Sequence, residues 1–228
     1  MTPLPLRIFI GYDPREAVAY HVLAHSILTR ASVPVSITPL ARHALRWIHT
    51  RKRGPLESTD FSITRFLVPY LCQYEGDAIY MDCDMLCLTD ITQVMDSAND
   101  ESVLLCPHLY TPTTPRKFFD QPNIPYPRKN WSSLMVFNNA RCRALTPEYV
   151  NTAPGLDLHR FLWLPDEEIG CLPLEWNWLV GEYEPNPLTK ILHYTLGGPW
   201  LYETRDCDHA KEWWDEYHLM TGGVHADR

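Results

Sequence analysis

Runs of hydrophobic residues alternate with an amphipathic segment in the first part of the chain. Residues 7–12 and residues 35–40 are short apolar runs of the kind that form buried strands. Residues 15–30 repeat apolar positions at helical spacing, and Asp13 and Pro14 precede them as a capping residue and a first helical residue. A strand, a helix and a strand of these lengths predict a βαβ unit and therefore a parallel sheet.

The rest of the chain continues the alternation of strands and helices. Apolar runs predict strands over residues 78–82, 103–106, 134–138 and 191–194, and helices are predicted over residues 63–73, 145–151 and 208–220. Residues 107–130 are rich in proline and predict a long loop, which in a compact domain is usually functional or mobile. No repeat or linker marks a second domain. We therefore predict one α/β domain over residues 1–228, with a mostly parallel central sheet flanked by helices and a C-terminal helix and tail over residues 207–228.

The composition fits a globular protein and narrows its partners. Of the 228 residues, 45% are hydrophobic and 21% are charged, which is enough to bury a substantial core. The net charge of -8 argues against nucleic-acid binding, because a phosphate backbone requires a basic surface. No run approaches the roughly 20 apolar residues of a membrane span, and the seven irregularly spaced cysteines are typical of thiols in a reducing compartment. We therefore expect a cytoplasmic location.

Residues 41–58 form a basic and partly apolar segment, with Trp47 and Ile48 among its cations. Such a segment can rest on anionic lipid as a peripheral membrane contact, or it can bind an anionic acceptor. A solvated loop explains the same residues equally well. The sequence leaves these three interpretations open.

Two aspartates follow the apolar run at 78–82 and form the most informative motif of the chain. Asp82 and Asp84 are two positions apart, and on an extended backbone this spacing places both carboxylates on the same face. Two such carboxylates repel each other unless a cation lies between them, and Mg²⁺ or Mn²⁺ takes these oxygens and often holds phosphates as well. Asp-x-Asp is common by chance, but ligands of open α/β sheets bind beyond the carboxyl ends of strands. The motif therefore predicts a metal-dependent enzyme that acts on a diphosphate compound.

A histidine and two glycines follow the apolar run at 191–194. His193 at a strand end can be a third metal ligand through a neutral ring nitrogen. Gly197 and Gly198 would let backbone amides approach phosphate oxygens. Taken alone, the segment fits a core histidine followed by a turn better than a metal site, so its weight comes from the other motifs.

In their order along the chain, these motifs resemble the retaining glycosyltransferases of family 8, which have the GT-A fold. The matching segments are Ile8–Asp13, Thr64-Arg65-Phe66, Ile79–Asp84, Trp131–Asn138, Asp166–Ile169 and His193–Trp200, and the resemblance spans roughly residues 6–200. Each piece is common by itself, whereas the ordered set is fairly specific. The resemblance implies a GT-A-like domain that uses a nucleotide-sugar donor.

The resemblance implies a metal site and a pair of acids near the sugar. Asp82, Asp84 and His193 would hold Mn²⁺, or Mg²⁺, together with the donor diphosphate. Asp166 and Glu167 would face the sugar hydroxyls, and they are the candidate catalytic residues if the reaction inverts and needs a base. Acids at the start of a helix are the alternative interpretation of these two residues.

The resemblance also implies a set of donor contacts. These are Tyr12 and Asp13 beside the nucleotide base, Asp84 or its neighbours beside the ribose, Arg65 beside the diphosphate or sugar, Ser132 and Ser133 at the border of the sugar, and Gly197 lining the phosphate pocket.

The chain departs from the family pattern at two places. The family's lysine before Pro-Trp is absent, because Gly198 precedes Pro199. Another cation, such as Lys190 or a basic loop residue, must then meet the phosphate charge. Trp131-Ser132-Ser133 stands where the family has Asn-Ala-Gly, so the identity of the donor sugar cannot be carried over.

We predict a metal-dependent hexosyltransferase-type enzyme that moves a sugar, with retention, from a nucleoside diphosphate donor. UDP is the favoured nucleotide, and the expected acceptor is a glycan or lipid-linked molecule, as in polysaccharide biosynthesis. A phosphatase of the haloacid dehalogenase type is one alternative, since it also places Asp-x-Asp after an apolar strand. A non-catalytic module that binds nucleotide-sugar or carbohydrate is the other.

Overall fold

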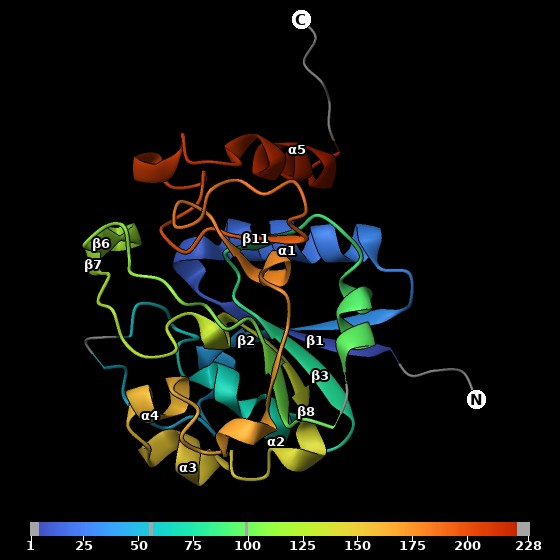
Figure 1. Ribbon diagram of the computed structural model, residues 1–228, viewed down its shortest axis with the longest axis vertical. Helices are drawn as coiled ribbons and strands as arrows, with labels where there is room; N and C mark the ends of the chain where they lie inside the picture. The colour runs from blue at the N-terminus through green and yellow to red at the C-terminus, as the bar shows by residue number, and fades with distance from the viewer. Residues whose placement is uncertain (1–4, 55–56, 99, 223–228) are drawn as a thin grey trace, which may run out of the picture.

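A six-stranded sheet forms the centre of the protein, and we describe it from a computed structural model of residues 5–54, 57–98 and 100–222. Its strands are β1 (Leu6–Tyr12), β2 (Val35–Ala41), β3 (Asp77–Met81), β5 (Val103–Leu105), β8 (Leu134–Asn138) and β9 (Ile169–Cys171), in the order β2-β1-β3-β8-β5-β9 (Figure 1). β8 runs antiparallel to both neighbours, whereas the other three pairings are parallel. The predicted α/β fold with a mostly parallel sheet is therefore confirmed.

The predicted βαβ unit is present at the N-terminus. The Asp13 carboxylate accepts a hydrogen bond from the Arg15 amide at 3.0 Å and starts a 3-10 turn, η1 (Pro14–Glu16), that leads into α1 (Ala17–Arg30). β2 then returns parallel to β1, with Leu6 paired to Val35 at the start of the register. Local hydrophobic spacing was sufficient to predict this unit.

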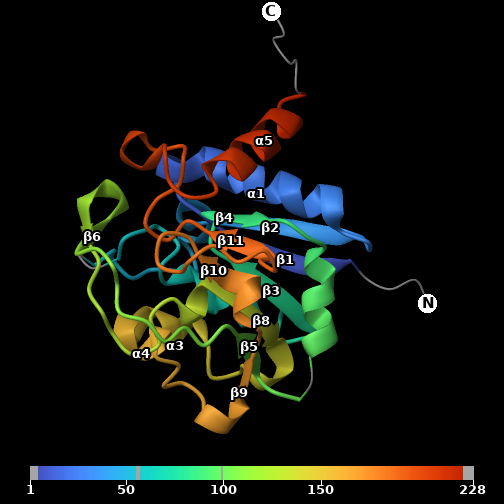
Figure 2. The same ribbon diagram turned by 45° about the horizontal axis from the view of Figure 1, so that its top comes forward.

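Alternating side chains of the central strands fill two hydrophobic layers. In β3, Ala78 and Tyr80 face one layer, and Ile79 and Met81 face the other. α1 covers the second layer, and α2 (Val68–Leu71), α3 (Pro147–Thr152) and α4 (Gly155–His159) cover the first (Figure 2). The predicted helix at 63–73 is wrong in its extent, because a 3-10 turn at Thr64–Leu67 precedes the four residues of α2. Left-handed backbone at Gln73 and Tyr74 then ends it.

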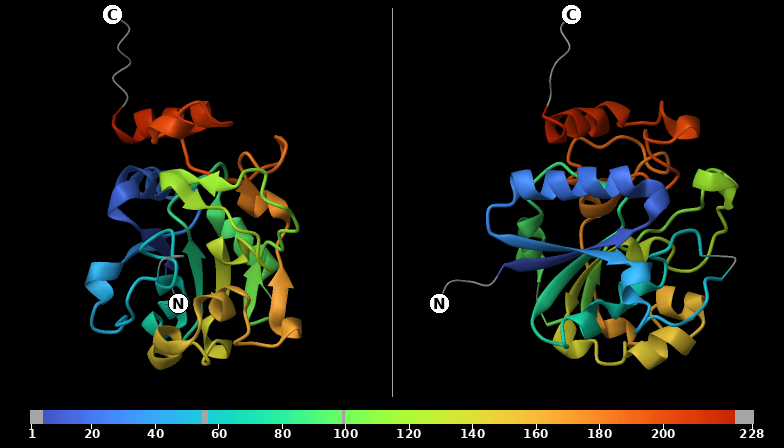
Figure 3. Two further views of the ribbon diagram at one scale, coloured as in Figure 1. Left: turned by 90° about the vertical axis from the view of Figure 1, so that its left-hand side faces the viewer. Right: turned by 180° about the vertical axis from the view of Figure 1, so that it is seen from behind.

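The C-terminal helix forms an outer layer on top of α1. α5 (Ala210–Met220) lies across α1, on the side away from the central sheet (Figure 3). Trp213 is fully buried there and packs in one cluster with Val22 of α1 and Leu192 of β11 (Ile191–His193). The neighbouring Trp214 is 37% exposed, so of these two tryptophans it is Trp213 that anchors the helix. Residues 223–228 of the predicted tail lie outside the described residues.

Two further sheets were not predicted from the sequence. One has three strands in the order β10 (Trp178–Leu179), β11 (Ile191–His193) and β4 (Met85–Cys87), and the other is a hairpin of β6 (Arg116–Lys117) and β7 (Gln121–Pro122) within the proline-rich loop. Because β3 ends at Met81 and β4 begins at Met85, Asp82 and Asp84 lie on a turn between two sheets. The expectation that they share one face of an extended strand is therefore wrong.

Among the described residues, none of the helices has the length and apolarity needed to cross a membrane.

Candidate active site

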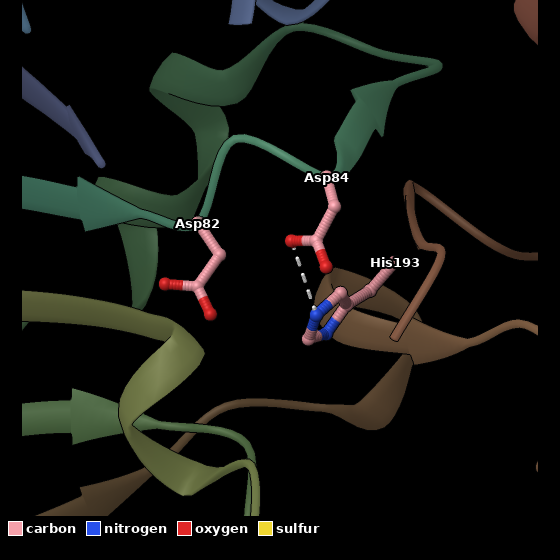
Figure 4. Close-up of side chains that lie close together, drawn as sticks. All are labelled: Asp82, Asp84 and His193. Atoms are coloured by element: carbon pink, nitrogen blue, oxygen red, sulfur yellow. Dashed lines mark ion pairs between the residues drawn. The ribbon is translucent and has the colours of Figure 1, made fainter. Parts of the chain in front are cut away.

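Three predicted metal ligands meet where the two larger sheets adjoin. Ligand atoms of Asp82, Asp84 and His193 all lie within 4.8 Å of one another, and all three residues are buried. Asp84 Oδ1 and His193 Nε2 are 3.4 Å apart, and the two side chains point into the space that Asp82 also faces (Figure 4). The backbone fixes this arrangement, since the Asp82 amide donates to the Ser133 carbonyl and the Tyr194 amide donates to the Asp84 carbonyl, each at 2.9 Å.

A buried chain of hydrogen bonds sets the tautomer of His193. The Ser133 hydroxyl donates to the Asn130 carbonyl at 2.6 Å, so its oxygen accepts from Asn177 Nδ2 at 2.8 Å. The Asn177 amide is thereby oriented with Oδ1 toward His193 Nδ1, at 2.9 Å. In neutral His193 the proton therefore resides on Nδ1, and the lone pair of Nε2 faces the two aspartates.

The electron pairs of this cluster fit a divalent cation. None of the described residues donates a hydrogen bond to Asp84 Oδ1, although this oxygen is fully buried. It faces the Nε2 lone pair of His193 at 3.4 Å, so the two atoms repel each other unless a proton or a cation lies between them. Two carboxylate oxygens and one imidazole nitrogen are a ligand set that Mn²⁺ or Mg²⁺ accepts.

Asp82 is held by a tyrosine and an arginine. The Tyr80 hydroxyl donates to Asp82 Oδ1 at 2.6 Å, and the Arg65 guanidinium forms a buried ion pair with the same oxygen at 3.0 Å. Burial raises the pKa of Asp82, Arg65 opposes this rise, and Asp84 adds to it. Arg65 in turn donates to the Ser132 carbonyl at 2.8 Å, which ties it to the start of β8. The acid pair is thus positioned before any ligand arrives.

A cavity of about 550 Å³ opens over this cluster. Its polar lining includes Arg65, Asp82, Asp84, Lys117, Lys129, Ser132, His159 and His193, and its apolar lining includes Phe61, Phe118, Ile124, Pro125 and Leu156. Polar groups gather at the metal cluster, while Ile124 and Leu156 are 53% and 49% exposed. The cavity can hold a ligand with one anionic part and one part in contact with apolar side chains.

The structure brings some of the predicted donor contacts into the cavity and keeps others out. Arg65 and Ser132 line it, whereas Ser133 does not: its hydroxyl contacts Asn177, which in turn bonds His193. Tyr12 and Asp13 do not line it. The Asp13 carboxylate is occupied by Arg15 and by the Asp60 amide; burial raises its pKa, but these hydrogen bonds outweigh burial and leave it below the usual value.

Gly197 lies beside the cavity without lining it. A side chain at this position would come within 3.1 Å of the Phe118 β-carbon, and the backbone φ of +118° favours glycine. Thr204 and Phe118 therefore occupy the space that a side chain at Gly197 would need.

Asp166 and Glu167 lie apart from the metal cluster. They belong to a 3-10 turn, η8 (Asp166–Glu168), that precedes β9. β9 runs in the same direction as β3, because it is parallel to β5, and both β3 and β5 are antiparallel to β8. The turn therefore lies at the amino edge of the sheet, whereas Asp82 follows the carboxyl edge of β3. Asp166 forms an ion pair with Arg128 at 2.7 Å and is largely exposed. Their catalytic role stays a prediction.

Several residues of the site were missed by sequence reasoning. Tyr80 could have been identified from the sequence, since it lies two positions before Asp82. His159 bonds Ser132 Oγ at 2.8 Å, and burial followed by Arg65 lowers its pKa to about 3. Neither His159 nor Asn177 follows a pattern that identifies it in the sequence.

The basic segment at 41–58 uses much of its charge internally. Arg42 donates to the Arg51 carbonyl, Arg51 donates to two carbonyls at the end of α3, and Arg53 donates to the Ser58 carbonyl. Trp47 is 69% exposed. The contacts explain how the segment is held, and a peripheral membrane contact stays a prediction.

Comparison of the sequence with known proteins finds a relative of high identity. No family model matches the chain. Protein CDI from Arabidopsis thaliana is 47% identical over 222 residues, which cover 93% of this chain and 86% of that protein.

Similar solved structures are glycosyltransferases at low sequence identity. The bifunctional glycosyltransferase WbbM superposes with a TM-score of 0.67 at 16% identity over 98% of this chain, and this chain spans about half, 53%, of WbbM. The galactosyltransferase LgtC, solved with donor and acceptor sugar analogues, gives 0.63 at 14% identity over 95% of this chain and 96% of LgtC. GlyE from Streptococcus pneumoniae gives 0.62 at 14% identity over 96% of this chain and 63% of GlyE. At these identities the likeness establishes the fold, and membership of family 8 stays a prediction. The chain has the GT-A fold and belongs to the same family as Protein CDI of Arabidopsis thaliana.

Proposed function

We propose that this protein is a metal-dependent glycosyltransferase that uses a nucleoside diphosphate sugar as donor. The observation that carries the proposal is the convergence of Asp82, Asp84 and His193 at the base of a cavity in a GT-A fold. The carboxyl end of β3 supplies the aspartates, at the edge of the sheet where α/β proteins bind ligands. The GT-A neighbours support the same reaction class.

The ligand set suits Mn²⁺ or Mg²⁺ better than a softer ion. Asp82 and Asp84 offer hard carboxylate oxygens, and His193 offers one neutral nitrogen, whereas none of the described cysteines belongs to the cluster. When bound, such a cation neutralises the negative charge that a departing diphosphate develops. Arg65 holds Asp82 in place, and Asn177 holds His193 in the ligating tautomer.

We infer transfer with retention from the carboxylates that line the cavity. Inversion requires a base for the acceptor hydroxyl. Apart from the metal pair, Glu57 is the one carboxylate among the described lining residues, and its Oε1 accepts from the Gly54 amide at 2.9 Å. Besides the metal pair, the described part of the cavity wall thus offers one carboxylate, and one of its oxygens is engaged with the backbone.

We infer the donor from the resemblance and the acceptor from the lining of the cavity. We infer a UDP-sugar as donor, with Arg65 and Ser132 beside the diphosphate and sugar, as the resemblance implies. Ile124 and Leu156 at the apolar side support a glycan or lipid-linked acceptor with an apolar face.

A cytoplasmic location is supported by the free state of all seven cysteines.

Nucleotide release tests the proposal. Purified protein would be incubated with a panel of UDP-sugars, with Mn²⁺ or with a chelator, and released UDP would be measured. We expect Mn²⁺-dependent release that falls by roughly a hundredfold or more in Asp84→Asn, since this change removes a charged metal ligand. Asp215→Asn is the matched control, because Asp215 is exposed on α5 and pairs with Lys211.

Two other results would replace the proposal. Tight binding of UDP-sugars with Mn²⁺ but without any turnover or transfer would favour a binding module. Release of phosphate from simple monoesters, without release of UDP from any sugar donor, would favour a phosphatase.

A further inference from the structure

Two lysines line the cavity, and neither has an ion pair with a carboxylate among the described residues. Lys117 lies on β6, and Lys129 lies near the end of the same proline-rich loop. Lys129 is only 8% exposed and donates to the Ile124 carbonyl at 3.1 Å, and Lys117 is partly buried beside the Phe118 ring. Neither lysine ammonium forms an ion pair with a described residue, whereas the nearby Arg65 is paired with Asp82. Unpaired buried cations are costly unless a ligand completes them.

The two lysines line the same cavity as the metal cluster. Burial lowers the pKa of Lys117, while Asp84 and Asp82 raise it, which places its ammonium group within the field of both acids. Burial and then Lys117 lower the pKa of Lys129 to about 8. An anion between the lysines would relieve their repulsion, and it would also be adjacent to a cation on the aspartates.

The β6–β7 hairpin is fixed against the segment that follows His193. The Phe118 amide donates to the Leu196 carbonyl at 2.9 Å, and Arg15 covers the Phe119 ring at 4.5 Å. A side chain at Gly198 would come within 1.9 Å of the Trp200 ring, so a lysine at that position would require this ring to move. The hairpin brings Lys117 to the same neighbourhood from a different part of the chain.

We propose that Lys117 and Lys129 form the binding site for the donor diphosphate, with Lys117 beside the phosphate that leaves. This inference rests on the proposed function. In the transfer, the bond between the anomeric carbon and the phosphate oxygen breaks, and its electron pair stays on the diphosphate, whose negative charge rises by one. The acceptor oxygen bonds to the anomeric carbon, and its proton passes to the departing diphosphate or to water. Lys117 balances the added charge.

Calorimetric titration of the whole chain tests this site apart from catalysis. UDP, UMP and Mn²⁺ alone would be titrated into wild type, Lys117→Met, Lys117→Arg and Lys190→Met. Lys190 is the matched control and the rival cation, since its ammonium lies over Trp176 at 4.3 Å and does not line the cavity. We expect Lys117→Met to weaken UDP binding in Mn²⁺ by about tenfold to a hundredfold. UMP binding should change less, Mn²⁺ binding alone should not weaken, and Lys117→Arg should restore part of the loss.

Lys129→Met provides a second variant if Lys117→Met unfolds, and it should weaken UDP binding more than UMP binding as well. Wild-type UDP affinity in both lysine variants would overturn the site while leaving the proposed function standing. A loss of UDP affinity in Lys190→Met alone would likewise overturn the site and leave the proposed function standing. Wild type that binds Mn²⁺ but none of UDP, GDP, ADP and CDP would instead refute the proposed function, and the diphosphate site with it.

Discussion

Substitutions of Asn177 test the hydrogen bond that orients His193 without changing any of the proposed metal ligands. Asn177 is fully buried, and its Oδ1 accepts from His193 Nδ1 at 2.9 Å. Asn177→Leu removes this acceptor at similar volume. His193 then either keeps a buried N–H without a partner, at about 1–3 kcal/mol, or moves its proton to Nε2, where it competes with a metal ion.

Both outcomes weaken metal binding by a predictable amount. Loss of such a supporting group typically costs about tenfold to a hundredfold in metal affinity, or about 1.4–2.7 kcal/mol. Asn177→Asp is the informative counterpart, because a carboxylate still accepts from His193 Nδ1 and makes the ring a stronger ligand. We therefore expect Asn177→Asp to bind Mn²⁺ at least as tightly as wild type, and Asn177→Leu to bind it at least about tenfold more weakly.

Mn²⁺ titration followed by electron paramagnetic resonance, with thermal unfolding of each apoprotein, measures these effects. A purely structural Asn177 would lower the stability of both variants and would not separate their metal affinities. Equal Mn²⁺ affinity in wild type and Asn177→Leu would refute the reasoning that this amide sets the tautomer of His193.

Three further predictions concern buried groups outside the metal ligands. Burial, followed by Asp84 and Asp13, raises the pKa of Glu16 well above its usual value. Folding therefore takes up a proton, and the free energy of unfolding falls as the pH rises above about 4.5. Glu16→Gln should remove this pH dependence, which amounts to up to about 1.4 kcal/mol in the free energy of unfolding per pH unit, as measured by urea denaturation. A pH dependence equal to that of wild type would contradict the prediction. Burial lowers the pKa of His49 to about 4 and that of His108 to about 3, so stability should decline as pH falls below about 6.5, by up to about 1.4 kcal/mol per unit for each. His49→Leu should flatten this decline, and a slope as steep as that of wild type would count against it. Trp213→Ala should cost about 3–5 kcal/mol in the free energy of unfolding, whereas a cost below about 1 kcal/mol would show that α5 docks without it.

Features with a local signal were predicted well. The β1–α1–β2 unit follows from hydrophobic spacing and from one capping aspartate. The acid pair was found because it follows an apolar strand, and His193 because it follows another. The turn between Asp82 and Asp84 was not foreseen, since a strand as short as β4 has no period to read.

Features that depend on topology could not be predicted in this way. The distance of Asp166 and Glu167 from the metal cluster follows from the direction of β9, which is set by its pairing with β5. Lys117 reaches the cavity because its hairpin docks on Leu196, a contact between segments about 80 residues apart that no local pattern encodes.

A crystal of the protein soaked with Mn²⁺ and UDP tests the central claim most directly, through the anomalous signal of manganese. We predict one strong peak roughly 2–2.5 Å from oxygens of Asp82 and Asp84 and from His193 Nε2, with the diphosphate of UDP at its remaining positions. A manganese peak away from these three side chains, or UDP bound with no metal between it and the aspartates, would contradict the account.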